Sequence, residues 1–275
     1  MNFFKHFTNV CVLLLAVFFI FTAFSCKSQP AAASGGNAGN AKSASNDGTF
    51  VVTGGPAILN LDFEDPSQPI PFTLHESSNV PACLMEYQDG KLHITNKVTG
   101  QTPWLHTNPI LGKHVRDFFW QFEYTSNYNT WDGNMFIFRA VGTDMNSGYH
   151  IHFLSQSSLE LRDKNSNLAQ NNDNLQLHYI FGGKVVNGVF ENNRVNIAST
   201  RLNWYTPGRV VMVRIVALED NCKIWVWQKG RAMPDKPTFD FTVEIPELES
   251  GDFMIVSWDS SFMIDNMVIF DRAVP

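Results

Sequence analysis

The stretch Phe-Phe-Trp-Gln-Phe-Glu-Tyr at residues 118–124 decides the fold, because its side chains alternate in character along the chain. In a β-strand, successive side chains point to opposite faces. One face then carries four aromatic side chains, those of Phe118, Trp120, Phe122 and Tyr124. The other face carries Phe119, Gln121 and Glu123. An aromatic face of this size has to pack against a second layer, so we expect this strand in the core of a layered β-structure.

The rest of the chain after residue 56 follows the same plan. Short β-rich segments are separated by Gly, Pro, Asn and Asp, and no stretch keeps a helical period. The candidate strands are 58–63, 91–95, 118–124, 135–141, 149–154, 159–162, 176–181, 195–198, 210–218, 223–228, 239–243, 253–257 and 262–270. One open sheet of more than ten strands would curl or leave long edges. We therefore predict an all-β, antiparallel two-sheet sandwich of jelly-roll type.

Trp225 and Trp227 stand two residues apart in the candidate strand 223–228, so they share one face of it. Strand aromatics mostly pack inside, and we favour a place between the sheets for this pair. The alternative is a platform on an exposed face.

The N-terminus has the three zones of a secretory signal. Lys5 precedes an apolar run at residues 10–24, and no acidic residue occurs before Cys26. Residues 23–26, Ala-Phe-Ser-Cys, resemble a bacterial lipobox, in which the cysteine is lipidated and becomes the mature N-terminus. The resemblance implies an exported, membrane-anchored bacterial lipoprotein at the periplasmic face or outer surface. A plain cleaved signal and an uncleaved membrane anchor remain as alternatives.

These features divide the chain into three parts. Residues 1–25 are the expected signal peptide. Residues 26–55 are rich in Ala, Ser, Gly and Asn, which predicts a flexible tether, and the lipobox resemblance implies that it is lipidated at Cys26. Residues 56–275 are long enough for one large domain, and no second low-complexity stretch divides them.

Charge and cysteine content narrow the partners. The mature chain has 19 basic and 26 acidic side chains, a formal charge of −7, which argues against nucleic acid and favours neutral or polar ligands. Cys83 and Cys222 could form a disulfide after export, or remain two separate buried thiols. No Cys/His spacing indicates zinc.

Several motifs, taken in order, resemble concanavalin A-like lectin/glucanase domains, and in particular LamG-like jelly rolls and domains related to 3-keto-disaccharide hydrolases. The matching segments are 61–65, 88–92, 117–118 with 122–124, 133–139 (Gly-Asn-Met-Phe-Ile-Phe-Arg), 147–152 (Ser-Gly-Tyr-His-Ile-His), 207–215 and 260–269. The resemblance implies a convex and a concave sheet, with ligands lying across the concave one. It places Arg139, His150 and His152 at polar positions of two paired central strands.

The two histidines share one strand face, where they could hydrogen-bond sugar hydroxyls, or ligate a metal if a third donor converged. Surface histidines without a ligand are the alternative. The turn-rich segment before residue 133 adds Tyr128, Trp131 and Asp132. Aromatic rings stack on sugars and carboxylates read hydroxyl groups, so this loop is a candidate carbohydrate contact, although a loop aromatic can also cover the core edge.

The resemblance also implies a structural calcium near the first and last strands. Glu64, Asp65 and Asp265 are the candidate ligands, since calcium prefers oxygen donors. The alternative is that Asp265 hydrogen-bonds a neighbouring turn.

No catalytic set is evident. The Glu-x-Asp-x-x-Glu motif of the laminarinase-like members is absent, as are the nucleophile elbow and the zinc-protease and phosphate-loop motifs. Three hypotheses follow: a lectin-like lipoprotein that binds carbohydrate without transforming it, a glycan hydrolase or lyase, and an adhesin or structural interaction module.

Overall fold

The structure is a computed structural model. It describes residues 57–70, 72–75, 83–96, 104–106, 114–127, 133–142, 147–154, 173–182, 184–186, 189–191, 194–257 and 261–271. The predicted signal peptide, Cys26 and the tether lie outside these residues. Within them, no helix is long and apolar enough to cross a membrane. The helical structure there is a single 3-10 turn, η1 (Pro246–Leu248).

Sheet A has eight strands. Its order is β15 (Phe239–Thr242), β14 (Asn221–Gln228), β13 (Val210–Leu218), β6 (Phe118–Ser126), β17 (Ser261–Asp271), β4 (Lys91–Asn96) and β3 (Cys83–Gln88). The eighth strand, β1 (Ala57–Leu61), pairs with the second half of β17, whereas β4 pairs with the first half. The long closing strand therefore holds the N-terminal strand of the domain in the sheet.

Sheet B has seven strands. Its order is β12 (Arg194–Thr200), β9 (Leu175–Ile180), β8 (Gly148–Phe153), β7 (Asn134–Ala140), β16 (Asp252–Ser257), β5 (Trp104–His106) and β2 (Thr73–His75). A separate hairpin joins β10 (Lys184–Val186) to β11 (Val189–Glu191).

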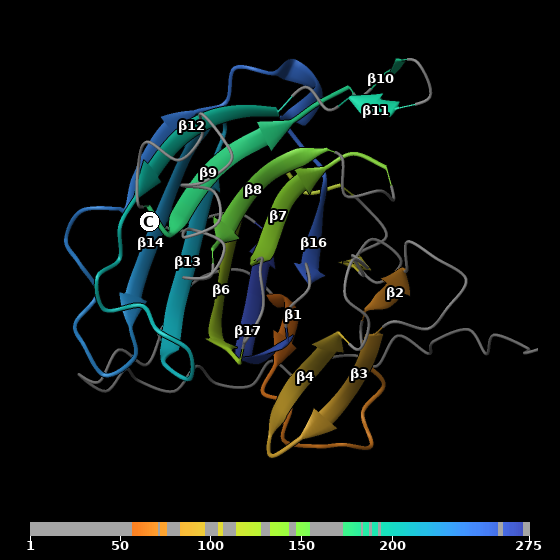
Figure 1. Cartoon of the computed structure of the whole chain (residues 1–275), viewed down its shortest axis with the longest axis vertical. Coiled ribbons are helices and arrows are strands. Elements are labelled where there is room, and N and C mark those ends of the chain that lie inside the picture. The colour runs from red at the N-terminus through yellow and green to blue at the C-terminus, as the bar shows by residue number, and fades with distance from the viewer. Residues whose placement is uncertain are drawn as a thin grey trace, which may run out of the picture. The chain divides into compact units, whose positions relative to one another are not determined.

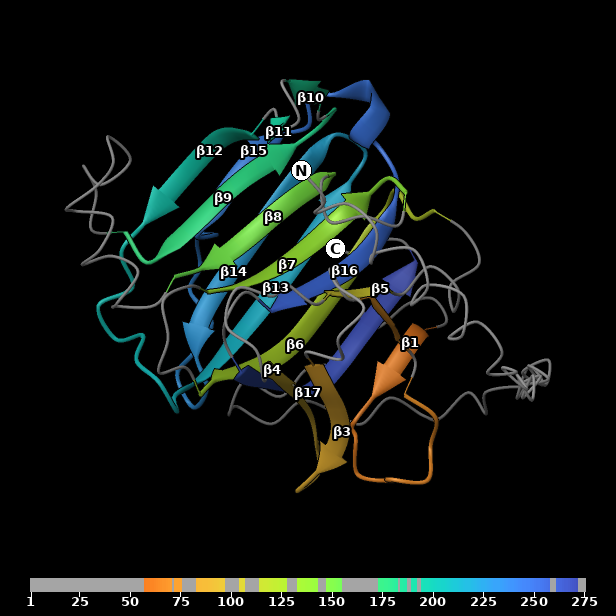
Figure 2. The same cartoon turned by 45° about the vertical axis from the view of Figure 1, so that its right-hand side comes forward.

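The two sheets form a sandwich, and Figures 1 and 2 show β9, β8 and β7 lying over β13 and β6. Every pairing between the described strands is antiparallel. The chain changes sheet on both sides of β2, β5 and β16, between β6 and β7, and between β12 and β13. The predicted all-β, two-sheet jelly roll is thus confirmed.

The aromatic face of β6 is the centre of the core, as its alternation predicts. Its four aromatic side chains are fully buried and meet rings from sheet B. The ring centroids are 4.8 Å apart for Phe118 and Phe253, and 4.4 Å apart for Phe122 and Phe136. Such tilted and edge-on contacts stabilise aromatic pairs beyond the area that they bury.

The tryptophan pair does not lie between the sheets, where the sequence favours it. In β14, Ile224 and Val226 face the core, so Trp225 and Trp227 lie on the outer face of sheet A. The guanidinium of Arg214, on the neighbouring strand, lies 5.5 Å from the ring centroids of both Phe119 and Trp227. The outer face is therefore covered by stacked rings and an arginine, which buries Trp227 without the second sheet.

A β-bulge breaks the alternation of β7 at Arg139. Asp252 of β16 pairs with Ala140, whereas Met254 pairs with Ile137, so three steps along β7 oppose two along β16. Arg139 is the additional residue, and its φ is 53°. A bulge re-aims the side chain that it carries. Arg139 consequently points toward sheet A, while Ile137 and Ala140 remain on the outer face of sheet B.

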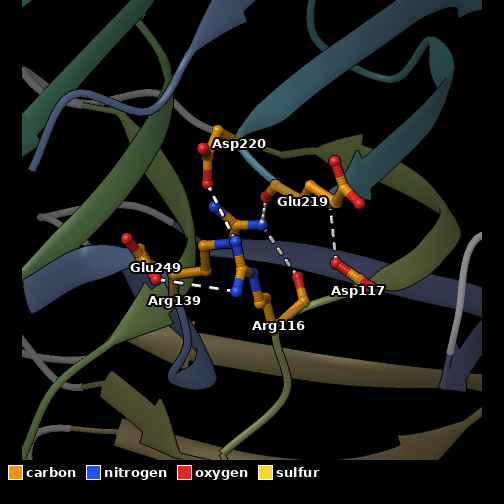
Figure 3. Close-up of polar contacts among 6 residues, drawn as sticks. All are labelled: Arg116, Asp117, Arg139, Glu219, Asp220 and Glu249. Atoms are coloured by element: carbon orange, nitrogen blue, oxygen red, sulfur yellow. Dashed lines mark hydrogen bonds and ion pairs between the residues drawn. The ribbon is translucent and has the colours of Figure 1, made fainter. Parts of the chain in front are cut away.

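Arg139 is completely buried and links the two sheets. Its Nη2 donates hydrogen bonds to the carbonyl oxygens of Arg116 (2.9 Å) and Glu219 (2.5 Å), which lie before β6 and in the β13–β14 turn of sheet A. We call these contacts the arginine junction (Figure 3). Around it, the Arg116 side chain pairs with Asp220 at 3.1 Å and with Glu249 at 3.7 Å.

Two glycines leave room for the bulge. A Cβ on Gly251 would overlap the carbonyl groups of Ala140 and Arg139, and it would lie 2.7 Å from the amide nitrogen of Ala140. A Cβ on Gly148, which has a φ of +93°, would lie 2.9 Å from the carbonyl oxygen of Phe138. The strands on either side of β7 can approach the bulge only because these positions lack side chains.

We expect Gly251→Ala to lower the free energy of unfolding by about 3 kcal/mol, because the added methyl group meets backbone that cannot move freely. Urea denaturation at neutral pH measures this change. Gly230→Ala is the matched control, since its φ is +82° but a Cβ added there would meet no heavy atom within 4 Å. The control should lose only the cost of a positive φ, about 1 kcal/mol. Equal losses would contradict the steric role of Gly251.

Candidate functional site

Three histidines lie together on the outer face of sheet B. His150 and His152 project from β8, since Tyr149, Ile151 and Phe153 of that strand face the core. His178 of β9 pairs directly with His150. The His150 and His178 rings stack with centroids 4.8 Å apart, and the His152 ring meets that of His178 edge-on at 5.9 Å.

Amide and guanidinium groups lie on the same outer face, between the histidines and the edge of the sheet. Arg194 of β12 donates from Nη2 to Oε1 of Gln176 at 2.9 Å, and from Nε to Oδ1 of Asn196 at 3.3 Å. Asn196 pairs with His178, and Gln176 pairs with His152. Arg194 and Asn196 are exposed, whereas the three imidazoles are buried. The polar face of sheet B consists of His150, His152, Gln176, His178, Arg194 and Asn196.

Burial determines the protonation of His150. Desolvation lowers its pKa to about 3, and the charge of Arg194 acts in the same direction. The backbone carbonyl of Ser147, 3.2 Å from Nε2, has the opposite but smaller effect. His150 is thus neutral near pH 7, and Nε2 is its proton donor to that carbonyl. A neutral imidazole beside amides and one guanidinium suits uncharged hydroxyl groups.

Arg139 does not belong to this face. Strict alternation would place it with Ile137 and the histidines, but the bulge turns it into the arginine junction. Arg139 therefore does not lie beside His150 and His152 on the carbohydrate face that the resemblance implies, and the reason is the one additional residue in β7. Of the other predicted contacts, Tyr128, Trp131 and Asp132 lie outside the described residues.

The candidate calcium ligands are not brought together. Asp65 is exposed, and its Oδ1 accepts hydrogen bonds from the backbone N–H and the hydroxyl of Ser67 at 2.9 and 2.6 Å. Asp265 is half-buried on β17, where burial and then the charge of Glu123 raise its pKa. Across the described residues, which include Glu64, no group of three or more His, Cys, Asp and Glu side chains is arranged to hold a metal ion.

The disulfide prediction is wrong. Cys222 is a buried free thiol on β14, and Cys83 begins β3. Four strands of sheet A separate β14 from β3, which corresponds to about 24 Å at the usual strand spacing. A disulfide requires Cα atoms within about 7 Å. Burial raises the pKa of the Cys222 thiol to about 11, so it stays protonated. For Cys222 this agrees with the alternative prediction of a separate buried thiol.

Sequence reasoning misses four members of the polar face. The signal that could have found Gln176 and His178 is the alternation in Leu-Gln-Leu-His-Tyr-Ile at residues 175–180, where they share one face. The pairing of β12 with β9 contains a register shift. Regular alternation therefore does not predict that Arg194 and Asn196 lie near His178.

Comparison with known proteins supports the fold. No family model matches the sequence, and no curated protein matches it. The fold is similar to the exoplasmic/lumenal domain of VIP36 in its Ca2+/Man2-bound form, with a TM-score of 0.53, 10% identity, and coverage of 79% of this chain and 89% of that chain. It is also similar to a Bacillus subtilis protein of unknown function with a galectin-like fold. There the TM-score is 0.52 at 8% identity, over 80% of this chain and 98% of that chain.

The chain thus has a lectin-like jelly-roll fold.

The pKa of His150 predicts a specific acid sensitivity. The unfolded chain has the ordinary pKa of 6.5 at this histidine, so between pH 3 and 6.5 it binds more protons than the folded chain. Stability contributed by the neutral ring is complete above pH 6.5 and falls as the pH drops through this window, by about 1.4 kcal/mol per pH unit. Urea denaturation at several pH values between 4 and 6 gives the slope of the free energy of unfolding against pH. The substitution His150→Gln should reduce this slope by the same amount. An imidazole of His150 that titrates near pH 6.5 in NMR spectra of the folded protein would contradict the prediction.

Proposed function

We propose that this protein binds carbohydrate through the polar face of sheet B and does not transform it. The observation that carries the proposal is the hydrogen-bonded set of Arg194, Gln176 and Asn196, which extends across β9 and β12. Each of these side chains is held in place by another. Groups held in advance lose little conformational freedom when a ligand binds.

The chemistry of the face fits sugar hydroxyl groups. A hydroxyl both donates and accepts, and the amides of Gln176 and Asn196 and the guanidinium of Arg194 offer both kinds of partner. The fold supports the same conclusion, because VIP36, which has a similar fold, is described in a Ca2+/Man2-bound form. From the sequence, Tyr128 and Trp131 would supply rings for stacking on a sugar, and Asp132 a carboxylate for its hydroxyls.

We further propose that the protein is exported and held at a bacterial membrane by a lipid on Cys26. The apolar run before Cys26 and the Ala/Ser/Gly/Asn-rich stretch after it support this proposal. A tether of this composition would let the domain reach glycans at some distance from the membrane.

Arg194→Ala should weaken glycan binding about tenfold, since it removes a charged donor and releases Gln176 and Asn196. A glycan array identifies a binding oligosaccharide, and calorimetry then compares the variants. Arg209→Ala is the control: Arg209 is also exposed and donates locally, to Thr206 at 3.1 Å, but precedes β13 of sheet A. Equal affinity of the Arg194→Ala variant and the wild type would exclude this face.

The same experiments separate the other functions. Binding with no product supports a lectin, whereas release of shortened sugars would show a hydrolase or lyase. If no glycan binds across a broad array, the protein is better explained as an adhesin or structural module.

Cys26→Ser should abolish lipid attachment and leave the domain folded, because Cys26 precedes the β-sandwich by a long tether. Mass spectrometry of the mature N-terminus and membrane fractionation of the producing bacterium measure the change. A wild-type chain that begins at another residue, without a lipid, would contradict the anchor.

A further inference from the structure

Within the described part of the chain, no carboxylate forms an ion pair with the buried guanidinium of Arg139. Its side chain has no solvent exposure. Among the described residues its polar partners are two carbonyl oxygens, both bound by Nη2. Nε and Nη1 are buried and find no acceptor there. A buried cation with N–H groups left over is costly unless an anion or an acceptor lies beside it.

The four acidic residues drawn around the arginine junction in Figure 3 do not fill this role. Asp220 and Glu249 lie on the Arg116 side chain, at 3.1 and 3.7 Å. Oδ1 of Asp117 accepts the backbone N–H of Glu219 at 2.7 Å. The Glu219 carboxylate points away from Arg139 in the close-up. These acids are therefore oriented toward other groups.

Two interior groups that interact with Arg139, the Tyr149 hydroxyl and the Cys222 thiol, are uncharged. Tyr149 and Cys222 both interact electrostatically with the guanidinium, and burial raises their pKa to about 12 and about 11. Both are protonated at neutral pH, so neither balances the arginine. Each nevertheless carries a polar hydrogen of its own, Oη–H and Sγ–H.

We propose that the interior of the sandwich beside Arg139 binds a small monovalent anion such as chloride, which Nε and Nη1 of Arg139 hold. Charge selects the class: a single negative charge neutralises the guanidinium, whereas a dianion would bring an unbalanced charge into the interior. Size limits it as well, since the Arg139 side chain has no exposure to solvent and only a small ion suits a buried position. The anion would stabilise the arginine junction and thereby the contact between the sheets. It is separate from the polar face of sheet B.

The test is thermal unfolding of the mature chain in sodium chloride and in sodium gluconate at equal ionic strength. The melting temperature should rise in chloride by about 3 °C for each tenfold increase above the dissociation constant, because the anion binds only the folded state. Arg139→Met should abolish the difference. Arg214→Met, the control, should retain it, since Arg214 donates to Gln121 and stacks on two rings at the outer face of sheet A.

If Arg139→Met does not fold, crystals of the wild type grown in bromide give the answer through anomalous scattering. A bromide peak beside the Arg139 guanidinium supports the proposal. Equal melting temperatures in both salts together with no such peak would overturn it, and a water molecule would then be the partner of Arg139. A chloride effect that persists in a folded Arg139→Met variant would also overturn it.

Discussion

The pair of hydrogen bonds from Arg139 to the carbonyl oxygens of Arg116 and Glu219 is the interaction on which the rest of the structure depends. It joins a strand of sheet B to the ends of two strands of sheet A. Close by, the backbone of Val115 bridges to that of Gly251, which precedes β16 of sheet B. Both connections lie where the chain leaves regular pairing, and they fix how the sheets meet at this end of the sandwich.

The bulge that creates this junction also separates two kinds of polar residue. One side chain, Arg139, is turned inward and contributes to the contact between the sheets. The histidines of β8 keep the regular alternation and stay on the outer face, next to β9 and β12. The paired strands β7 and β8 thus carry a structural side chain, Arg139, on the inner face and candidate ligand-binding histidines on the outer face. The distinction depends on one residue of register.

The sequence predicts well those features that depend on regular alternation. Phe118, Trp120, Phe122 and Tyr124 lie in the core as expected, and His150 and His152 share a face. These predictions succeed because the period of two holds along an unbroken strand. The sequence pattern does not predict β3, which begins with Cys83, and the distance of this residue from Cys222 depends on the order of strands in sheet A.

The errors come from contacts between distant segments. The bulge at Arg139 requires Gly148, which begins β8, and Gly251, which directly precedes β16, so no local pattern reveals it. Strand order decides the disulfide in the same way. The sequence favours Trp225 and Trp227 as core, but their place follows from Ile224 and Val226 filling the inner face and from Arg214 covering the outer one. Propensity alone does not distinguish the two faces of such a strand.

The most direct measurement is a crystal structure of the mature chain with an oligosaccharide selected on a glycan array. We predict sugar density over β9 and β12 on the outer face of sheet B, with hydroxyl groups within hydrogen-bond distance of Gln176, Arg194 and Asn196. Density on the outer face of sheet A, beside Trp225, would contradict the assignment of the polar face of sheet B.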